Sequence, residues 1–134
     1  MAGVQGSALA IAVSQAGALG SLPAAMLSAD ALRDELQRIT GQTSQPYNVN
    51  FFCHAPPTPQ AAQEAAWRQA LRPYYEELGV PLAAHPSGAA RAPFNFELAD
   101  VLAAYRPPVV SFHFGLPAPE LLARVRSWGA KVIS

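Results

Sequence analysis

The sequence predicts an α/β fold with a parallel sheet that is covered by helices. Short apolar or alternating runs, typical of strands, recur between longer segments with an apolar residue at every third or fourth position, typical of helices. Strands and helices that alternate along a chain are typical of parallel sheets with helices packed on them. Of the 134 residues, 51% are apolar and only 13% are charged, so the chain has ample material for a buried core.

The composition excludes several classes of function. Nine basic residues balance nine acidic ones without forming a cluster, so neither nucleic acid nor an anionic membrane is expected as a partner. The single cysteine, Cys53, excludes an internal disulfide and favours a reducing, cytoplasmic compartment. His54, His85 and His113 lack the spacing of metal ligands on a helix, and no metal site is expected. The apolar run at residues 8–13 is too short to cross a bilayer.

The first half of the chain reads as helix, strand, helix, strand. Ser7 is expected to cap a helix that ends at Gly17 and that is buried, since it is apolar on all sides. A short strand follows over residues 18–22. Ser28 is expected to cap the next helix, which ends at Gly41 and has a stripe of apolar residues at spacings of four and three: Leu32, Leu36 and Ile39. Residues 47–53 form the clearest strand.

The second half continues the alternation after a long helical stretch. Residues 59–79 are expected to form a helix pair, because Pro73 should kink or split a single helix. A loop over residues 81–93 leads to a helix capped by Asn95. A strand over 109–114, a last helix that ends at Gly129, and a strand over 131–134 complete the prediction.

Two asparagines interrupt the apolar strand at residues 47–53. Side chains alternate along a strand, so Asn48, Asn50 and Phe52 share one face, while Val49, Phe51 and Cys53 share the other. A buried amide needs hydrogen-bond partners. These amides are therefore either structural, bonded to a neighbouring segment, or available to bind the polar edge of a cofactor.

The strand at residues 109–114 shows a similar polar face. Ser111 and His113 lie on one face, and Val110, Phe112 and Phe114 are expected on the other. His113 is either a satisfied core histidine or, if this face lines a barrel, a site residue near the carboxyl end of the strand, where barrel active sites are built.

Several strings, taken in order along the chain, resemble one family, the nitronate monooxygenases, formerly called 2-nitropropane dioxygenases. They are residues 1–3 (MAG), 10–20 (AIAVSQAGALG), 48–52 (NVNFF), 111–117 (SFHFGLP) and 128–132 (WGAKV). The resemblance implies a (β/α)8 TIM barrel that holds FMN without a covalent bond. It also implies the oxidation of small alkyl nitronates by O2 to a carbonyl compound and nitrite.

The resemblance further implies that residues 1–134 are the N-terminal part of an FMN-binding barrel domain. They would supply about four βα units, truncated at both ends, of the eight that such a barrel contains. The family's catalytic base, in a Gly-Gly-His motif, and its phosphate-binding loops would lie beyond Ser134. No catalytic residue is therefore expected in this chain, which by itself would be inactive. Two alternatives are a non-catalytic remnant or assembly module that associates through open sheet edges, and a protein similar to FMN-dependent enoyl reductases.

The same resemblance assigns roles to individual residues. The backbone of Met1, Ala2 and Gly3 would approach the isoalloxazine ring, and Asn50 would form a hydrogen bond with it. Glycine suits such a position, since no Cβ blocks the approach. His113 and His54 would line the substrate pocket.

Overall fold

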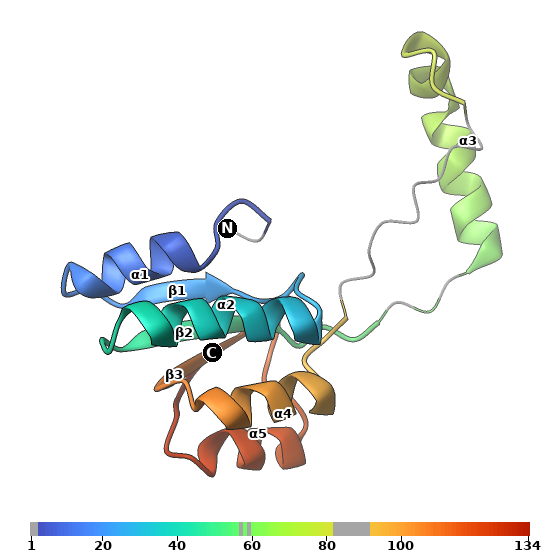
Figure 1. Cartoon of the computed structure of the whole chain (residues 1–134). Coiled ribbons are helices and arrows are strands. Elements are labelled where there is room, and N and C mark those ends of the chain that lie inside the picture. Colours follow the sequence, from blue (N-terminus) through green and yellow to red (C-terminus); the bar gives the residue numbers. More distant parts are fainter. Residues whose placement is uncertain (1–2, 57, 59, 82–91) are drawn as a thin grey trace. The chain divides into compact units, whose positions relative to one another are not determined.

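The computed structural model describes residues 3–56, 58, 60–81 and 92–134 (Figure 1). Met1, Ala2 and most of the loop expected over residues 81–93 lie outside this part of the chain. Two compact units are present, and each is considered by itself: Met1–Ala55 with Arg91–Ser134, and Pro56–Ala90. No helix in the described ranges has the length and apolar character that crossing a membrane requires.

The first unit is built on a parallel sheet, which confirms the predicted fold class. Its strands are β1 (Gly20–Pro23), β2 (Tyr47–Phe52), β3 (Val109–His113) and β4 (Lys131–Ile133). They lie in the order β1-β2-β3-β4, and each neighbouring pair is parallel. β1 begins two residues later than predicted. The chain first completes a turn at Gly17, whose φ is +88°, and Ala18 N–H donates to the carbonyl oxygen of Val13.

Four helices form a row on one face of this sheet: α1 (Ser7–Gln15), α2 (Ala29–Gln42), α4 (Phe96–Tyr105) and α5 (Pro119–Arg126). Each contacts the next in that order (Figure 1). The sheet residues that face them are among the most deeply buried of the protein: Leu22, Val49, Phe51, Val110 and Phe112. Among the described residues of this unit, no helix lies on the opposite face of the sheet, and that face carries the polar strand positions.

Two helix starts follow the prediction. The Ser28 side chain accepts a hydrogen bond from Ala31 N–H, and the Asn95 side chain accepts one from Leu98 N–H. Such caps satisfy backbone N–H groups that have no partner within the helix. The apolar stripe of α2 is fully buried, as expected: Leu32, Leu36 and Ile39. α2 does continue through Gly41, one residue past its expected end.

The expectations for α1 were wrong in two respects. Gly6 is the cap residue and Ser7 is the first helical residue, whose N–H donates to the carboxylate of Glu35 from α2. The helix is also buried on one side only, and Leu9 is 49% exposed. α1 is the outermost helix of the row, so its outer side has no neighbour among the described residues.

The helix pair expected over residues 59–79 is one helix, α3 (Ala61–Glu77), with Pro73 inside it. Proline removes one backbone hydrogen bond. The helix nevertheless continues. The Arg72 side chain donates to Glu76 at 2.9 Å across the proline, and the Ala, Arg and Leu residues before Pro73 and the two glutamates after it favour helix.

The chain returns to the sheet at Phe94. Its N–H donates to the carbonyl oxygen of Phe52 at 2.9 Å, at the end of β2. Its ring lies 4.7 Å from that of Phe51 and 5.2 Å from that of Phe112. The residues that leave β2 and those that begin α4 are therefore held together at the sheet.

Candidate functional site

A hydrogen-bonded row of polar side chains crosses three strands on the face that the helices leave open. Asn48 Nδ2 donates to Ser21 Oγ and to Ser111 Oγ, both at 2.8 Å. Ser111 Oγ in turn donates to Asn50 Oδ1 at 2.8 Å. The parallel register sets Ser21 beside Asn48 and Asn50 beside Ser111, and so aligns these side chains.

The row is not fully satisfied. Asn48 is buried, and its Oδ1 has no hydrogen-bond partner among the described residues. An unpaired buried carbonyl oxygen costs about 1–3 kcal/mol. Asn50 is half-buried, its Oδ1 is bonded to Ser111, and within the described ranges no bond engages its Nδ2. The face can therefore donate a hydrogen bond from Asn50 Nδ2, whereas Asn48 Oδ1 is closed off from solvent and is not presented on it.

The structure places Asn50 and His113 on this same face. Asn50 contacts Ser111, and His113 follows Ser111 by two residues along β3, so the two side chains point the same way. His113 is exposed and lies beside Phe52 at the carboxyl ends of the strands. In barrels, side chains at this end of the strands build the active site.

Four rings gather at this end of β2 and β3, and we call them the aromatic cluster: Phe52, His54, His113 and Phe114. The Phe114 ring lies 4.4 Å from that of His113 and 5.1 Å from that of Phe52, both in edge-to-face orientation. The ring of His54 lies 6.5 Å from that of Phe114. The cluster brings both predicted pocket histidines together.

The expected position of Phe114 was wrong. Strand alternation put its side chain on the helix-covered face with Val110 and Phe112. The strand ends at His113, however, and Phe114 has a φ of +68°, in the left-handed region. This turn carries its ring into the aromatic cluster. Phe52 and Phe114 were therefore not predicted as site residues. The adjacent Gly115, also at positive φ, was the available sign of a sharp turn.

Gly3 lies near the same end of β1. Its φ is +77°, and a Cβ at this position would meet no atom closer than 3.7 Å. Gly3 and Pro23 both line a hollow of about 440 Å³, and Pro23 is the register partner of Asn50. Gly3 thus lies near the end of β1, but Asn50 does not line this hollow, which Glu35 of α2 also lines. Met1 and Ala2, which were predicted to join them, lie outside the described residues.

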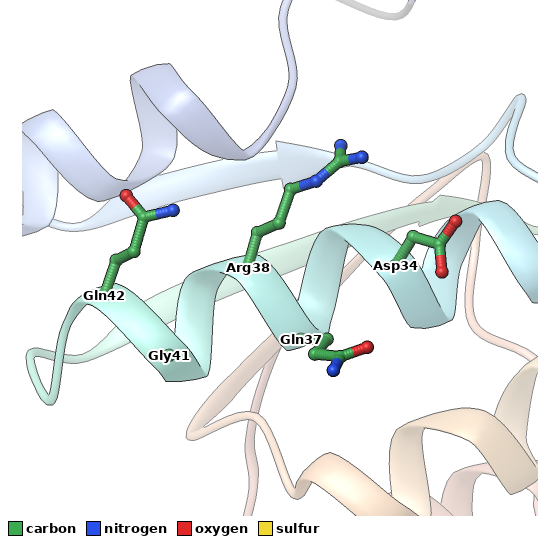
Figure 2. Close-up of a pocket in the computed structure, with 5 residues that line it drawn as sticks. All are labelled: Asp34, Gln37, Arg38, Gly41 and Gln42. Atoms are coloured by element: carbon green, nitrogen blue, oxygen red, sulfur yellow. The ribbon is translucent and has the colours of Figure 1, made fainter.

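Two other features contribute nothing to this site. A shallow hollow on α2 is lined by residues of that helix alone: Asp34, Gln37, Arg38, Gly41 and Gln42. Figure 2 shows that the side chain of Gln37 leaves the helix on a different side from those of Arg38 and Gln42, so they do not converge on a ligand. Burial raises the pKa of the Cys53 thiol, which disfavours the reactive thiolate. In the described ranges, no group of three potential metal ligands occurs.

A family model described as nitronate monooxygenase matches residues 1–134. The nitronate monooxygenase of Paraburkholderia phytofirmans is 37% identical over 139 residues, which cover 100% of this chain and 37% of that protein. That of Pseudomonas aeruginosa is 36% identical over 137 residues, which cover 99% of this chain and 38% of that protein. This chain thus spans less than two-fifths of the length of these relatives.

Two solved structures are similar to this chain in fold. A nitroalkane oxidase from Streptomyces ansochromogenes superposes with a TM-score of 0.76 at 34% identity, covering 98% of this chain and 37% of that one. FabK from Thermotoga maritima shares the fold. It superposes with a TM-score of 0.58 at 23% identity, covering 98% of this chain and 30% of that one. The alternating helices and parallel strands thus resemble part of a TIM barrel. Since the family model matches its whole length, the chain belongs to the nitronate monooxygenase family.

Proposed function

We propose that this chain forms one side of an FMN site in an enzyme that oxidises alkyl nitronates with O2 to a carbonyl compound and nitrite. The observation that carries the proposal is the Asn50 amide, which is held by Ser111 on the open face of the sheet. Family membership supports the reaction class. The carboxyl ends of parallel barrel strands are where such sites are built.

The residues present fit a flavin ring. The ring edge alternates C=O and N–H groups, and the open face offers a donor at Asn50 Nδ2 that can bind one of the ring carbonyl groups. Beside them, Phe52 and Phe114 supply aromatic surface for an apolar ring system. Gly3 has no Cβ, so its backbone can approach the ring closely. FMN, when bound, supplies the redox chemistry between substrate and O2.

The chain's own residues then bind the flavin ring and orient the groups that face it. Ser111 donates to Asn50 Oδ1, which fixes the amide so that Nδ2 is the group presented on the open face. The backbone at Gly3 lines one edge of the site. His54 and His113 border the substrate, and the neighbouring phenylalanine rings supply apolar surface at that border. We assign no catalytic base to this chain.

An NMR titration of the full chain with FMN tests the proposal. We expect the Asn50 side-chain amide signals and the Gly3 backbone signal to shift in a saturable way, but only at high FMN concentrations, because the phosphate-binding loops are expected to lie beyond Ser134. Asn50→Ala should weaken binding by about two- to twelvefold, since a hydrogen bond contributes about 0.5–1.5 kcal/mol and 1.4 kcal/mol corresponds to a factor of ten.

The matched control is Gln37→Ala, which removes an amide on the outer face of α2. It should leave FMN affinity unchanged. Two results would contradict the proposal: no FMN-dependent shift at Asn50, or an Asn50→Ala variant with unchanged affinity and a lower free energy of unfolding. The second result would make Asn50 a structural clamp.

A further inference from the structure

Phe114 has an unusual backbone for its residue type. Its φ of +68° lies in the left-handed region, which bulky side chains rarely adopt because the Cβ crowds the backbone. Among the described residues, Arg106 is the other non-glycine residue with positive φ, and it is the C-cap of α4, where this conformation is common. Phe114 caps no helix.

Burial in the core does not explain this conformation. The Phe114 side chain is 62% exposed, so the left-handed turn does not place a large apolar group in the interior. What the turn achieves is contact with neighbouring rings. The Phe114 ring meets that of His113 at 4.4 Å with planes at 73°, and that of Phe52 at 5.1 Å with planes at 71°. Edge-to-face packing of this kind is favourable between aromatic rings.

The His113 imidazole depends on these rings for its orientation. Within the described ranges, no hydrogen bond engages either of its nitrogens, and its side chain is exposed. Phe114 covers one side of it, and Phe52 lies 5.9 Å away. An exposed imidazole without a hydrogen bond would otherwise exchange among its rotamers freely.

We propose that Phe114 is a positioning residue for His113. Its strained turn holds the phenyl ring against the imidazole and so fixes the direction in which the imidazole faces the open end of the sheet. Backbone strain that is retained at a site and brings no burial is typical of functional positions. The inference rests on the proposed function only in naming the substrate border as the place that His113 serves.

The test records the ring carbon–proton NMR signals of His113 in the full chain, without FMN. In the wild type, the phenyl ring current should displace these signals from the values of a free histidine. Phe114→Ala should move them towards the free values, whereas Phe114→Tyr, which keeps the ring, should restore them. The control is Phe96→Ala, which removes another exposed phenylalanine, at the start of α4, and should change nothing.

A comparison of two ringless variants tests the strain. Phe114→Gly should unfold at a higher temperature than Phe114→Ala, because glycine adopts positive φ without cost. Unchanged His113 signals in Phe114→Ala would overturn the proposal, and so would a Phe114→Gly variant that is no more stable than Phe114→Ala.

These readouts are independent of the proposed function. If FMN fails to shift the Asn50 signals while Phe114→Ala still releases His113, the FMN site is wrong and the positioning role stands. If FMN binds as expected but His113 keeps its signals in Phe114→Ala, the positioning role alone is wrong.

Discussion

A Cβ atom on Gly20 would lie 1.9 Å from the carbonyl oxygen of Ala10, because the first residue of β1 passes directly against the backbone of α1. Ser14 holds this contact in place. Its Oγ accepts a hydrogen bond from Gly20 N–H at 3.2 Å and donates one to the carbonyl oxygen of Pro46 at 3.0 Å. One serine thereby joins α1 to the beginnings of two neighbouring strands.

The first prediction concerns this close approach. Gly20→Ala should lower the free energy of unfolding by about 1–3 kcal/mol, since backbone must move to admit the methyl group. Urea denaturation measures the effect. Gly41→Ala is the matched control, because nothing lies within 4 Å of its added Cβ and the residue is helical. That change should instead stabilise by about 0.5–1 kcal/mol. A similar response of the two variants would contradict the packing of α1 against β1.

The second prediction concerns pH. Burial of the Glu35 carboxyl group would raise its pKa, but hydrogen bonds from Ser7 and the charge of Arg38 outweigh this effect and lower it below the ordinary value of 4.5. A lowered pKa in the folded state stabilises the protein above the unfolded-state pKa, and this stabilisation is lost as the pH falls through the folded-state value.

Glu35→Gln keeps a hydrogen-bond acceptor for Ser7 N–H but cannot titrate. The variant should therefore lose less stability than the wild type as the pH falls from neutral to below 4.5. Thermal unfolding of both proteins across this range gives the difference. Parallel stability curves for the two proteins would show that the carboxylate does not stabilise the start of α1.

The third prediction concerns Tyr47, whose hydroxyl is buried and has no partner among the described residues. Burial, with a smaller effect from Tyr105, raises its pKa from 10.0 to about 12. Because the folded state then holds the proton more tightly, the protein should lose stability as the pH rises from 10.0 to about 12.

Tyr47→Phe should be as stable as the wild type at neutral pH, or slightly more so, because it removes a desolvated hydroxyl group. It should lose less stability in the alkaline range. Its tyrosinate absorbance should also lack the component that the wild type shows with a pKa of about 12. The prediction is contradicted if the absorbance component that Tyr47→Phe removes has a pKa near 10.0, because Tyr47 would then not be desolvated.

Features with local causes could be predicted from the sequence. Ser28 and Asn95 cap helices through their own side chains, and the spacing of Leu32, Leu36 and Ile39 defines a buried helix face whatever the rest of the chain does. Strand alternation likewise gave the two faces of β2. The roles assigned to Met1, Ala2, Gly3, Asn50, His54 and His113 at a cofactor or substrate stay predictions.

Features with distant causes could not be predicted. Glu35 caps α1 from another helix, and no short sequence pattern links it to Ser7. The exposed side of α1 depends on which helices lie beside it. The side-chain direction of Phe114 could not be predicted, because alternation applies only within a strand. Phe114 follows the end of β3 in a left-handed conformation, which redirects its side chain. Aromatic neighbours at the ends of two strands become visible only when the register is known.

The hydrogen bond from Phe94 to Phe52 has a consequence for how this protein can vary. It joins the two ends of the segment that contains α3 at one point of the sheet. The chain between Phe52 and Phe94 is therefore an insertion whose two ends are held at a fixed distance. The entropic cost of closing such a loop grows only slowly with its length. The segment between the two phenylalanines can therefore tolerate insertions, deletions and substitutions while β2 and β3 keep their register.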